Sequence, residues 1–287
     1  MVIFSPLSNG LVPAFIQRLD QVGVPLLQGA NESLRAVRLY FDWLAIRRRV
    51  ADEKVEKAFT PIAFDFGADK SLSERASKKL LSAYGIPVAA DELVQTAEEA
   101  VRAAEAIGYP VVMKVDSPDI LHKTEAGIVR LGLQSADEVR AAYAEITANA
   151  KAYDSTARVS GVSVQEMVPK GVEILLGVKN DAIFGPSVMV GLGGIFVEVF
   201  KDYALRLAPL DEAAAMEMID SLKGSKLLYG ARGAQPADVP ALADALVRLS
   251  RLAKDHADNI AEMDINPLIV LPKGQGVKAV DALVVQK

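Results

Sequence analysis

The sequence predicts a mixed α/β and α+β protein made of several units. Strands and helices alternate over residues 1–50, helices with isolated strands fill residues 71–158, and strand follows strand over residues 159–209. Alternating strands and helices are typical of parallel sheets, whereas consecutive strands separated by turn residues indicate antiparallel pairing. With 287 residues, the chain is long enough for two or three subdomains with cores of their own.

Composition excludes several classes of function. The chain is 51% hydrophobic and 24% charged with a net charge of -5, which argues against a nucleic-acid binder, since such proteins cluster Lys and Arg. It has no cysteine, so disulfides, zinc thiolate sites and thiol nucleophiles are ruled out. No apolar run reaches the length of a membrane span, and the amino terminus does not resemble a signal peptide. We therefore expect a cytoplasmic protein with no nucleic-acid or membrane partner.

The first 50 residues read as a βαβα fragment. Its strands are predicted at Val2–Phe4 and Val24–Leu27, with helices over Val12–Val22 and from Glu32 onward. Two parallel strands do not make a stable sheet alone, because parallel strands are normally buried on both faces. We therefore expect an apolar sheet edge that needs covering, which leaves room for an oligomer. The charged, weakly periodic residues 51–70 are predicted to be a linker.

Residues 71–158 are predicted to form the first of two α+β subdomains. Ser73 is placed to cap a helix that runs to Tyr84, and Thr96 to cap a helix over Ala97–Ile107. Two short strands follow at 111–115 and 129–133, and the next helix begins after Ser135. The loop between those strands, residues 116–127, is long and polar, as functional loops often are.

Two residues of this stretch suggest chemistry. Lys114 lies inside an otherwise apolar strand, where an ammonium is costly unless it meets an anion, either a protein carboxylate or a phosphate. His122 lies on the loop beyond and fits no helix or strand period, so packing does not explain it. We interpret the pair as a nucleotide-phosphate site with a phosphoryl-accepting imidazole beside it.

Residues 159–287 are predicted to form the second subdomain. Val162–Val168 and Glu173–Lys179 alternate on either side of a Pro-Lys-Gly turn, which is typical of a hairpin. The glycines of 191–194 let backbone N–H groups approach a ligand, although for the glycines alone a tight turn is the favoured explanation. Arg206 has the fork geometry that suits phosphate. A helix is predicted from Pro240 to Lys254, with His256 exposed just beyond its end.

A second polar constellation lies near the carboxyl end. On a strand, Glu262, Asp264 and Asn266 point to one face while Met263 and Ile265 point to the other. Oxygen ligands of this kind suit Mg²⁺, and Asp281 on the following strand adds a carboxylate. The alternative is a polar face turned to solvent. We favour the metal because the apolar residues after Pro267 indicate a buried strand.

Five motifs in the same order resemble one known family. They are GYPVVMKV, SPDILHKTEAG, VQEMVPKGVE, GLGGIFVEVFKDYALRLAPL and EMDINPL, and the resemblance they carry covers about Leu72 to Val285. Together they are similar to the ATP-grasp domain of NDP-forming (ADP-forming) acyl-CoA synthetases, relatives of succinyl-CoA synthetase. Residues 1–49 resemble the end of that family's flavodoxin-like CoA-ligase region. The expected fold is therefore an ATP-grasp fold, two α+β subdomains that clasp a nucleotide, preceded by a partial flavodoxin-like fragment.

The resemblance implies roles for residues at matching positions. His122 would carry a phosphoryl group between ATP and a second site on the way to acyl phosphate and acyl-CoA. Lys114 and Arg206 would contact phosphates. The resemblance gives two further sets: Glu166, Val168, Glu173, Gly191, Gly193 and Gly194 would hold ATP or ADP, and Asp264, Asn266 and Asp281 would bind Mg²⁺.

The same resemblance predicts an acid-CoA ligase that needs a partner. CoA would bind only to an upstream region or a CoA-binding subunit that this sequence does not include. One departure is Ile128, where the family has a second glycine after Gly127, because a β-branched residue disfavours positive φ. Two alternatives stay open: a nonenzymatic ATP-binding regulatory module, and another ATP-grasp ligase that joins a carboxylate to an amine.

Overall fold

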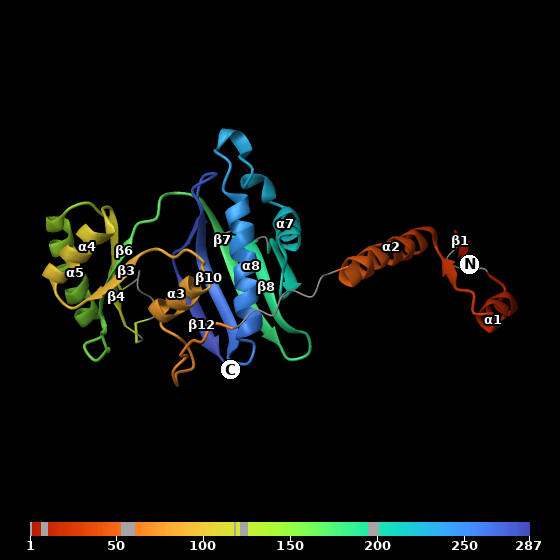
Figure 1. Cartoon of the computed structure of the whole chain (residues 1–287), viewed down its shortest axis with the longest axis horizontal. Helices are drawn as coiled ribbons and strands as arrows, with labels where there is room; N and C mark the ends of the chain where they lie inside the picture. The colour runs from red at the N-terminus through yellow and green to blue at the C-terminus, as the bar shows by residue number, and fades with distance from the viewer. Residues whose placement is uncertain (1, 7–10, 53–60, 118, 121–125, 195–200) are drawn as a thin grey trace. The chain divides into compact units, whose positions relative to one another are not determined.

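The computed structural model describes residues 2–6, 11–52, 61–117, 119–120, 126–194 and 201–287 (Figure 1). The chain divides into two compact units, Met1–Thr60 and Pro61–Lys287. The second unit contains two hydrophobic cores, each beneath its own sheet. The candidate functional residues that the structure describes are distributed over two lobes, each built on one of these sheets.

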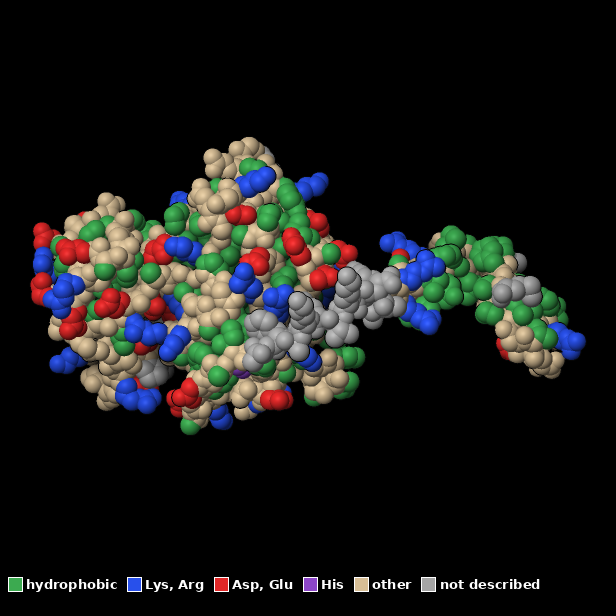
Figure 2. Space-filling model, in the orientation of Figure 1, with side chains coloured by type: hydrophobic (Ala, Val, Ile, Leu, Met, Phe, Trp, Pro, Cys, Tyr) green, Lys and Arg blue, Asp and Glu red, His purple; other side chains and the backbone are tan. Residues whose placement is uncertain are grey.

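The first unit is the predicted βαβα fragment. Strand β1 (Ile3–Ser5) pairs in parallel with β2 (Leu26–Gln28), and the helices are α1 (Pro13–Gln21) and α2 (Ala30–Asp52). Hydrophobic side chains gather over this unit (Figure 2). Several large ones are at least half exposed: Phe4, Leu34, Leu39, Tyr40, Phe41, Trp43 and Ile46. The sequence predicted an apolar sheet edge, but apart from Phe4 of β1 these side chains belong to helix α2, so the exposed apolar surface of this unit is mainly helical.

The smaller lobe of the second unit is a four-stranded antiparallel sheet in the order β3-β6-β4-β5. Its helices α4 and α5 lie together on one side of the sheet (Figure 1), and their buried residues share one core with the sheet. Thr96 caps α4 as predicted and Ser135 caps α5, each accepting a hydrogen bond from the third residue of its helix. The elements are β3 (Asp91–Val94), α4 (Ala97–Ile107), β4 (Val111–Asp116), β5 (Val129–Leu133), α5 (Ala136–Tyr153) and β6 (Gly161–Glu166).

The larger lobe is a six-stranded sheet in the order β11-β10-β7-β8-β9, with β12 pairing to the other half of β10. Helix α8 packs along the sheet (Figure 1) and buries most of its length in the core. The elements are α3 (Glu74–Ala83), β7 (Val172–Asp181), β8 (Gly185–Leu192), β9 (Tyr203–Leu207), α7 (Glu212–Asp220), two 3-10 turns (Ser225–Leu227 and Ala231–Gly233), α8 (Val239–Asp255), β10 (Ile260–Val270), β11 (Val277–Ala279) and β12 (Ala282–Gln286).

The expected hairpin around residues 169–171 is wrong, although both of its strands exist. β6 pairs with β3 and β4 of the smaller sheet, whereas β7 pairs with β8 and β10 of the larger one. The Pro-Lys-Gly segment therefore crosses from one sheet to the other. The division expected between residues 158 and 159 falls before β6, while the two sheets divide after Glu166. Alternation identifies a strand but does not identify its partner.

Helix α3 and part of the expected linker also belong to the larger lobe. Leu80 and Leu81 of α3 are fully buried in its core, and Ile62, Phe64 and Phe66 pack against that core from residues 61–70. The backbone N–H of Leu72 donates to the carbonyl of Val284 at 2.9 Å, which fixes the start of α3 to β12. The chain thus enters the larger lobe before it builds the smaller one.

The expectation of an exposed His256 is wrong. The imidazole is only 6% exposed, its Nε2 lies 3.1 Å from the hydroxyl of Tyr84, and it packs edge-on against Phe66. The Tyr84 hydroxyl donates to Asp255 at 2.9 Å. His256 does follow the end of α8, as predicted, but side chains distant in sequence cover that end. A local pattern carries no information about such a covering.

Candidate functional site

The open face of the larger sheet carries the expected oxygen ligands. Along β10, Met263 and Ile265 are buried while Glu262, Asp264 and Asn266 are exposed, so the predicted alternation is confirmed. Asp281 follows β11 and precedes β12, and its carbonyl accepts a hydrogen bond from the N–H of Asn266 at 3.2 Å. The structure therefore brings Asp264, Asn266 and Asp281 to one place.

The charges at this place favour a cation. Desolvation by the surrounding sheet, followed by the negative charge of Asp281, raises the pKa of Asp264. A cation held between the two carboxylates would remove that repulsion, and the amide oxygen of Asn266 is a suitable third ligand for Mg²⁺. Among the described residues no group of three or more His, Cys, Asp or Glu side chains is arranged to hold a metal. The candidate set fits Mg²⁺ with two carboxylates and one amide.

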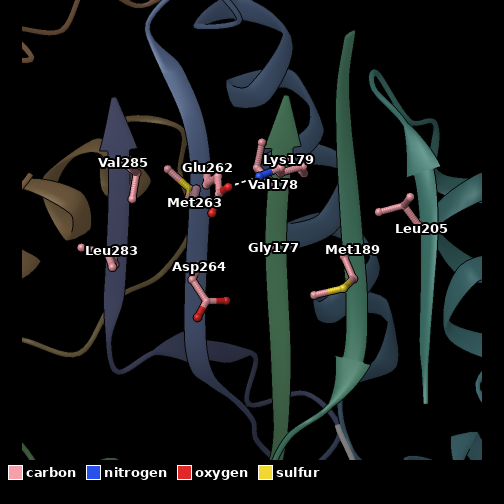
Figure 3. Close-up of a pocket in the computed structure, with 10 residues that line it drawn as sticks. All are labelled: Gly177, Val178, Lys179, Met189, Leu205, Glu262, Met263, Asp264, Leu283 and Val285. Atoms are coloured by element: carbon pink, nitrogen blue, oxygen red, sulfur yellow. Dashed lines mark hydrogen bonds and ion pairs between the residues drawn. The ribbon is translucent and has the colours of Figure 1, made fainter. Parts of the chain in front are cut away.

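A hollow on the same face adjoins Asp264 (Figure 3). Gly177 of β7 lies directly opposite Asp264, and its missing side chain leaves room beside the carboxylate. Glu262, two residues along β10, forms an ion pair with Lys179 instead. The charge of Glu262 is thus already neutralised by Lys179, so Glu262 is not one of the three candidate metal ligands. Met189, Leu205, Leu283 and Val285 line the rest of the hollow.

Lys114 has the anionic partner that its position required. Its ammonium lies 2.5 Å and 2.6 Å from the two carboxylate oxygens of Glu74, at the first turn of α3. Lys78, one turn further along α3, lies 2.9 Å from the same carboxylate and is only 2% exposed. Burial raises the pKa of Glu74, but the two ammonium groups outweigh it and leave the pKa below its ordinary value. Of the two partners left open by the sequence, the structure shows the carboxylate.

Side chains at the junction connect the two sheets. Gln165 of β6 donates to the carbonyl of Val280 at 3.0 Å, immediately before Asp281. Glu166 forms an ion pair with Lys278 of β11 and also accepts from the N–H of Ala90 at 3.3 Å. Gln165 and Lys114 share the open face of the smaller sheet, because Gln165 lies opposite Val112 and Lys114 opposite Ser163. The face of Lys114 therefore adjoins the end of the larger sheet that carries Asp281.

The turn at Gly193 and Gly194 lies against Glu173 at the start of β7. The N–H of Gly193 donates to the carbonyl of Glu173 at 2.7 Å, and a Cβ on Gly193 would lie 2.8–2.9 Å from Glu173 atoms. Gly194 has a φ of +61°, and Gly191 is a buried member of β8. Packing alone thus requires glycine at 193. Val168, in the segment between the sheets, is half buried.

Arg206 is not brought to this site. It lies opposite Val188, a core residue beneath the larger sheet, and its guanidinium donates to Glu217 of α7 at 2.7 Å. Its neighbour Leu205 faces the hollow on the other side. Because successive strand residues alternate between faces, Arg206 points away from Asp264.

His122 lies outside the described residues. Ile128, the departure noted in the sequence, is fully buried in the core of the smaller lobe, and its carbonyl accepts from Val115 at 3.1 Å. Gly127 has the positive φ, +66°, and among the described non-glycine residues only Lys201 has one. The strain expected from a β-branched residue at 128 therefore does not arise.

Sequence reasoning missed the side chains that join the lobes. Glu74, Lys78, Gln165 and Lys278 gave no isolated signal, since charged and polar residues on helices and strands are usually solvated. The one available hint was the four-residue spacing of Glu74 and Lys78 directly after the Ser73 cap. Their convergence on Lys114 and Glu166 follows only from the tertiary fold.

The fold and the candidate site together define a class: a two-lobed α+β module with a lysine on the open face of one sheet and carboxylate and amide side chains on the open face of the other. A family model described as an ATP-grasp domain matches residues 66–285. The chain is 44% identical over 217 residues to the beta subunit of an ADP-forming acetate–CoA ligase II from Pyrococcus furiosus, covering 76% of this chain and 92% of that subunit. The chain therefore belongs to the ATP-grasp family, in the branch of ADP-forming acyl-CoA ligases.

Two further similarities show how the chain relates to longer and to solved proteins. It is 41% identical to an ADP-forming 4-hydroxybutyrate–CoA ligase from Nitrosopumilus maritimus, with 88% of this chain aligned but only 37% of that protein. A solved acetyl-coenzyme A synthetase from Ca. Korarchaeum cryptofilum superposes with a TM-score of 0.68 and 45% identity, covering 76% of this chain and 93% of that one. That structure contains coenzyme A and Mg-AMPPCP, with a phosphohistidine segment pointing towards the nucleotide site. Within the described part of this chain, no helix is long and apolar enough to cross a membrane.

Proposed function

We propose that this chain is the nucleotide-binding, phosphoryl-transferring part of an ADP-forming acid-CoA ligase. The observation that carries the proposal is that the sheet face bearing Lys114 also bears Gln165, whose hydrogen bond to Val280 reaches the end of the larger sheet where Asp264, Asn266 and Asp281 lie together. Phosphoryl transfer needs neutralised charge and aligned atoms more than covalent machinery, and these groups supply both. The cytoplasmic location expected from the absence of cysteine is part of this proposal.

In the proposed arrangement, Lys114 binds a phosphate oxygen of ATP, and the segment from Glu166 to Glu173 lies beside the adenosine. Asp264, Asn266 and Asp281 would hold Mg²⁺, which when bound would supply positive charge to the phosphates. Gly193 and Gly194 keep the turn against Glu173 narrow, so that backbone rather than side chain borders the nucleotide. Arg206 is left out of the phosphate site because it is bound to Glu217 on the opposite face.

His122 is proposed as the phosphoryl acceptor. Its neutral imidazole attacks the γ-phosphorus, the bond to the β-γ bridging oxygen breaks, and ADP leaves. The phosphoryl group then passes to a carboxylate to give an acyl phosphate, and CoA thiolate displaces phosphate to give acyl-CoA. These later steps require a CoA-binding subunit or domain, which residues 61–287 do not provide.

The test is phosphorylation by ATP labelled at the γ position. We expect acid-labile label on the wild-type chain, loss of label in His122→Gln, and full label in His256→Gln, the matched control that removes the other histidine. Acyl-CoA should form only when a CoA-binding subunit of the same family is added. ATP binding without label would support a regulatory module instead, and turnover with an amine but no phosphoenzyme would support a carboxylate-amine ligase.

A further inference from the structure

The ammonium of Lys114 lies at a small hollow between α3 and the smaller sheet. Glu74, Leu93, Lys114, Asp116 and Ser163 are among the residues that line it. Lys114 and Ser163 lie directly opposite one another on β4 and β6, so their side chains are neighbours on one face. Ser163 is 6% exposed, and its hydroxyl has no hydrogen-bond partner among the described residues. A buried hydroxyl without a partner is costly, so a ligand atom that pairs with it is favoured.

The charges around this hollow balance only because Glu74 is present. Its carboxylate faces two ammonium groups, Lys114 and Lys78, and both of its oxygens lie within 2.6 Å of Lys114. Arg75 lies 3.8 Å from Asp91 and offsets it, while Asp116 adds a further carboxylate at the rim. Glu74 is therefore the anion that Lys114 binds in the free protein. A phosphate that binds Lys114 must therefore displace the carboxylate of Glu74.

The backbone of Glu74 is fixed independently of Lys114. Its helix packs on the larger lobe through Leu80 and Leu81, and the preceding Leu72 is bonded to β12. Lys114 belongs to the smaller lobe, so the ion pair spans the two. Glu74 therefore stays in place when Lys114 changes partner, and its repulsion of an incoming phosphate persists unless the lobes shift.

We propose that Glu74 competes with nucleotide phosphate for Lys114 and so sets the affinity of the nucleotide site: it holds Lys114 in the free protein and yields that contact to a nucleotide phosphate. One phosphate oxygen then accepts hydrogen bonds from both Lys114 and Ser163. Displacing Glu74 costs binding free energy, so the residue lowers the affinity for any ligand whose phosphate reaches Lys114 and leaves the affinity for uncharged nucleosides unchanged. The inference rests on the proposed function, because it assumes that Lys114 binds phosphate.

The test is calorimetric titration of the full chain with Mg²⁺ and AMPPCP, a nonhydrolysable ATP analogue. Glu74→Gln should bind AMPPCP about tenfold more tightly, because it keeps the shape but removes the competing charge. Ser163→Ala should bind it several-fold more weakly, because it removes a donor. Adenosine affinity should not change in either variant. Glu92→Gln, the same charge change at an exposed residue of β3, is the matched control and should leave AMPPCP affinity unchanged.

Glu74→Gln leaves the buried ammonium of Lys78 without its carboxylate partner. If that variant does not fold, a substitution of Lys78 tests the same inference. Lys78→Met should weaken AMPPCP binding, because Glu74 then interacts with Lys114 alone. Adding Glu74→Gln to Lys78→Met should restore and exceed wild-type affinity. If removal of the Glu74 charge weakens binding or leaves it unchanged in both backgrounds, the inference is overturned. If the wild type does not bind AMPPCP, or Lys114→Met binds it equally well, the proposed function itself fails.

Discussion

The carboxylate of Glu74 lies 2.5 Å from the ammonium of Lys114, although the first belongs to the larger lobe and the second to the smaller. This ion pair joins the lobes beside the face that carries the proposed nucleotide site. It explains how a lysine is tolerated in the middle of a sheet without ligand. It also determines how several substitutions should behave.

Replacing Lys114 by Met should weaken ATP binding about 10–100-fold, because a charge-assisted contact with phosphate is lost while the apolar stem is kept. Adenosine binding should be unaffected. Lys151→Met, on the exposed last turn of α5, is the control and should behave as wild type. Fluorescence competition with a labelled ATP analogue measures all three. Equal ATP affinity in the two variants would count against a phosphate contact at Lys114.

Acid should remove the stabilising contribution of the Glu74 cluster. The pKa of Glu74 is below its ordinary value of 4.5, so its stabilising contribution is complete above about pH 4.5 and is lost as pH falls through the lower, folded-state pKa. Denaturant unfolding at pH 6 and pH 3.5 measures the loss. Glu74→Gln should remove this part of the pH dependence, and an unchanged acid slope in the variant would exclude the cluster as its source.

Asp264→Asn should stabilise the metal-free protein near neutral pH, by about 1–2 °C in Tm, because it removes a partly buried charge and, second, its repulsion with Asp281. The pKa of Asp264 is raised, so the stability gained by protonating it is present at low pH and is lost as pH rises through the folded-state pKa. The same variant should lose most of the thermal shift that Mg²⁺ with ATP gives the wild type. Thermal scans with and without Mg²⁺ and ATP measure this shift in Tm. An Asp264→Asn variant that keeps the full wild-type shift would argue against this metal site.

His256 should make the protein sensitive to mild acid. Burial lowers the pKa of His256 below 6.5, against the opposing effect of Asp255, so the unfolded state takes up the proton first. Stability is therefore complete above about pH 6.5 and falls at lower pH, by at most about 1.4 kcal/mol per pH unit. Urea unfolding of wild type and His256→Phe at pH 7.5 and 5.5 gives the comparison. The variant should lose this dependence, and an equal slope in both proteins would refute it.

Gly193→Ala should destabilise the larger lobe by about 1–3 kcal/mol, because the new Cβ would lie 2.8–2.9 Å from backbone and Cβ atoms of Glu173. Gly177→Ala is the matched control, since its methyl would meet the flexible end of Met189 at 3.2 Å. Urea unfolding compares the two. A larger loss for Gly177→Ala would mean that the turn at Gly193 is not packed as described.

Local signals in the sequence were sufficient for most individual elements. Ser73, Thr96 and Ser135 cap the helices that their spacing predicted, and β5 runs from Val129 to Leu133 as expected. Caps and periodicity act within one or two turns, so the sequence carries them directly. Strand β3 escaped notice because Asp91–Val94 is short and half polar.

Relationships between distant segments could not be predicted in the same way. Three features depend on which surfaces meet in the folded chain. They are the pairing of β6 with β4, the packing of His256 against Phe66 and the face of the larger sheet on which Arg206 lies. For the site, the shared face of Asp264 and Asn266 could be predicted because both residues lie on one strand. The ion pair of Lys114 with Glu74 was not, since 40 residues separate the two.

The most direct test of a nucleotide held between the lobes uses Mn²⁺ in place of Mg²⁺ and follows the methyl resonances of methionine. Met189 lines the hollow beside Asp264, whereas Met218 is buried in the core with α7. Mn²⁺ with ATP should broaden the Met189 signal much more than the Met218 signal. The effect should be weakened in Lys114→Met and lost when Asp264 and Asp281 are both replaced by Asn. Equal broadening of the two methyls, or selective broadening of Met189 that survives the Asp264 and Asp281 substitutions, would contradict a metal–nucleotide site on this face.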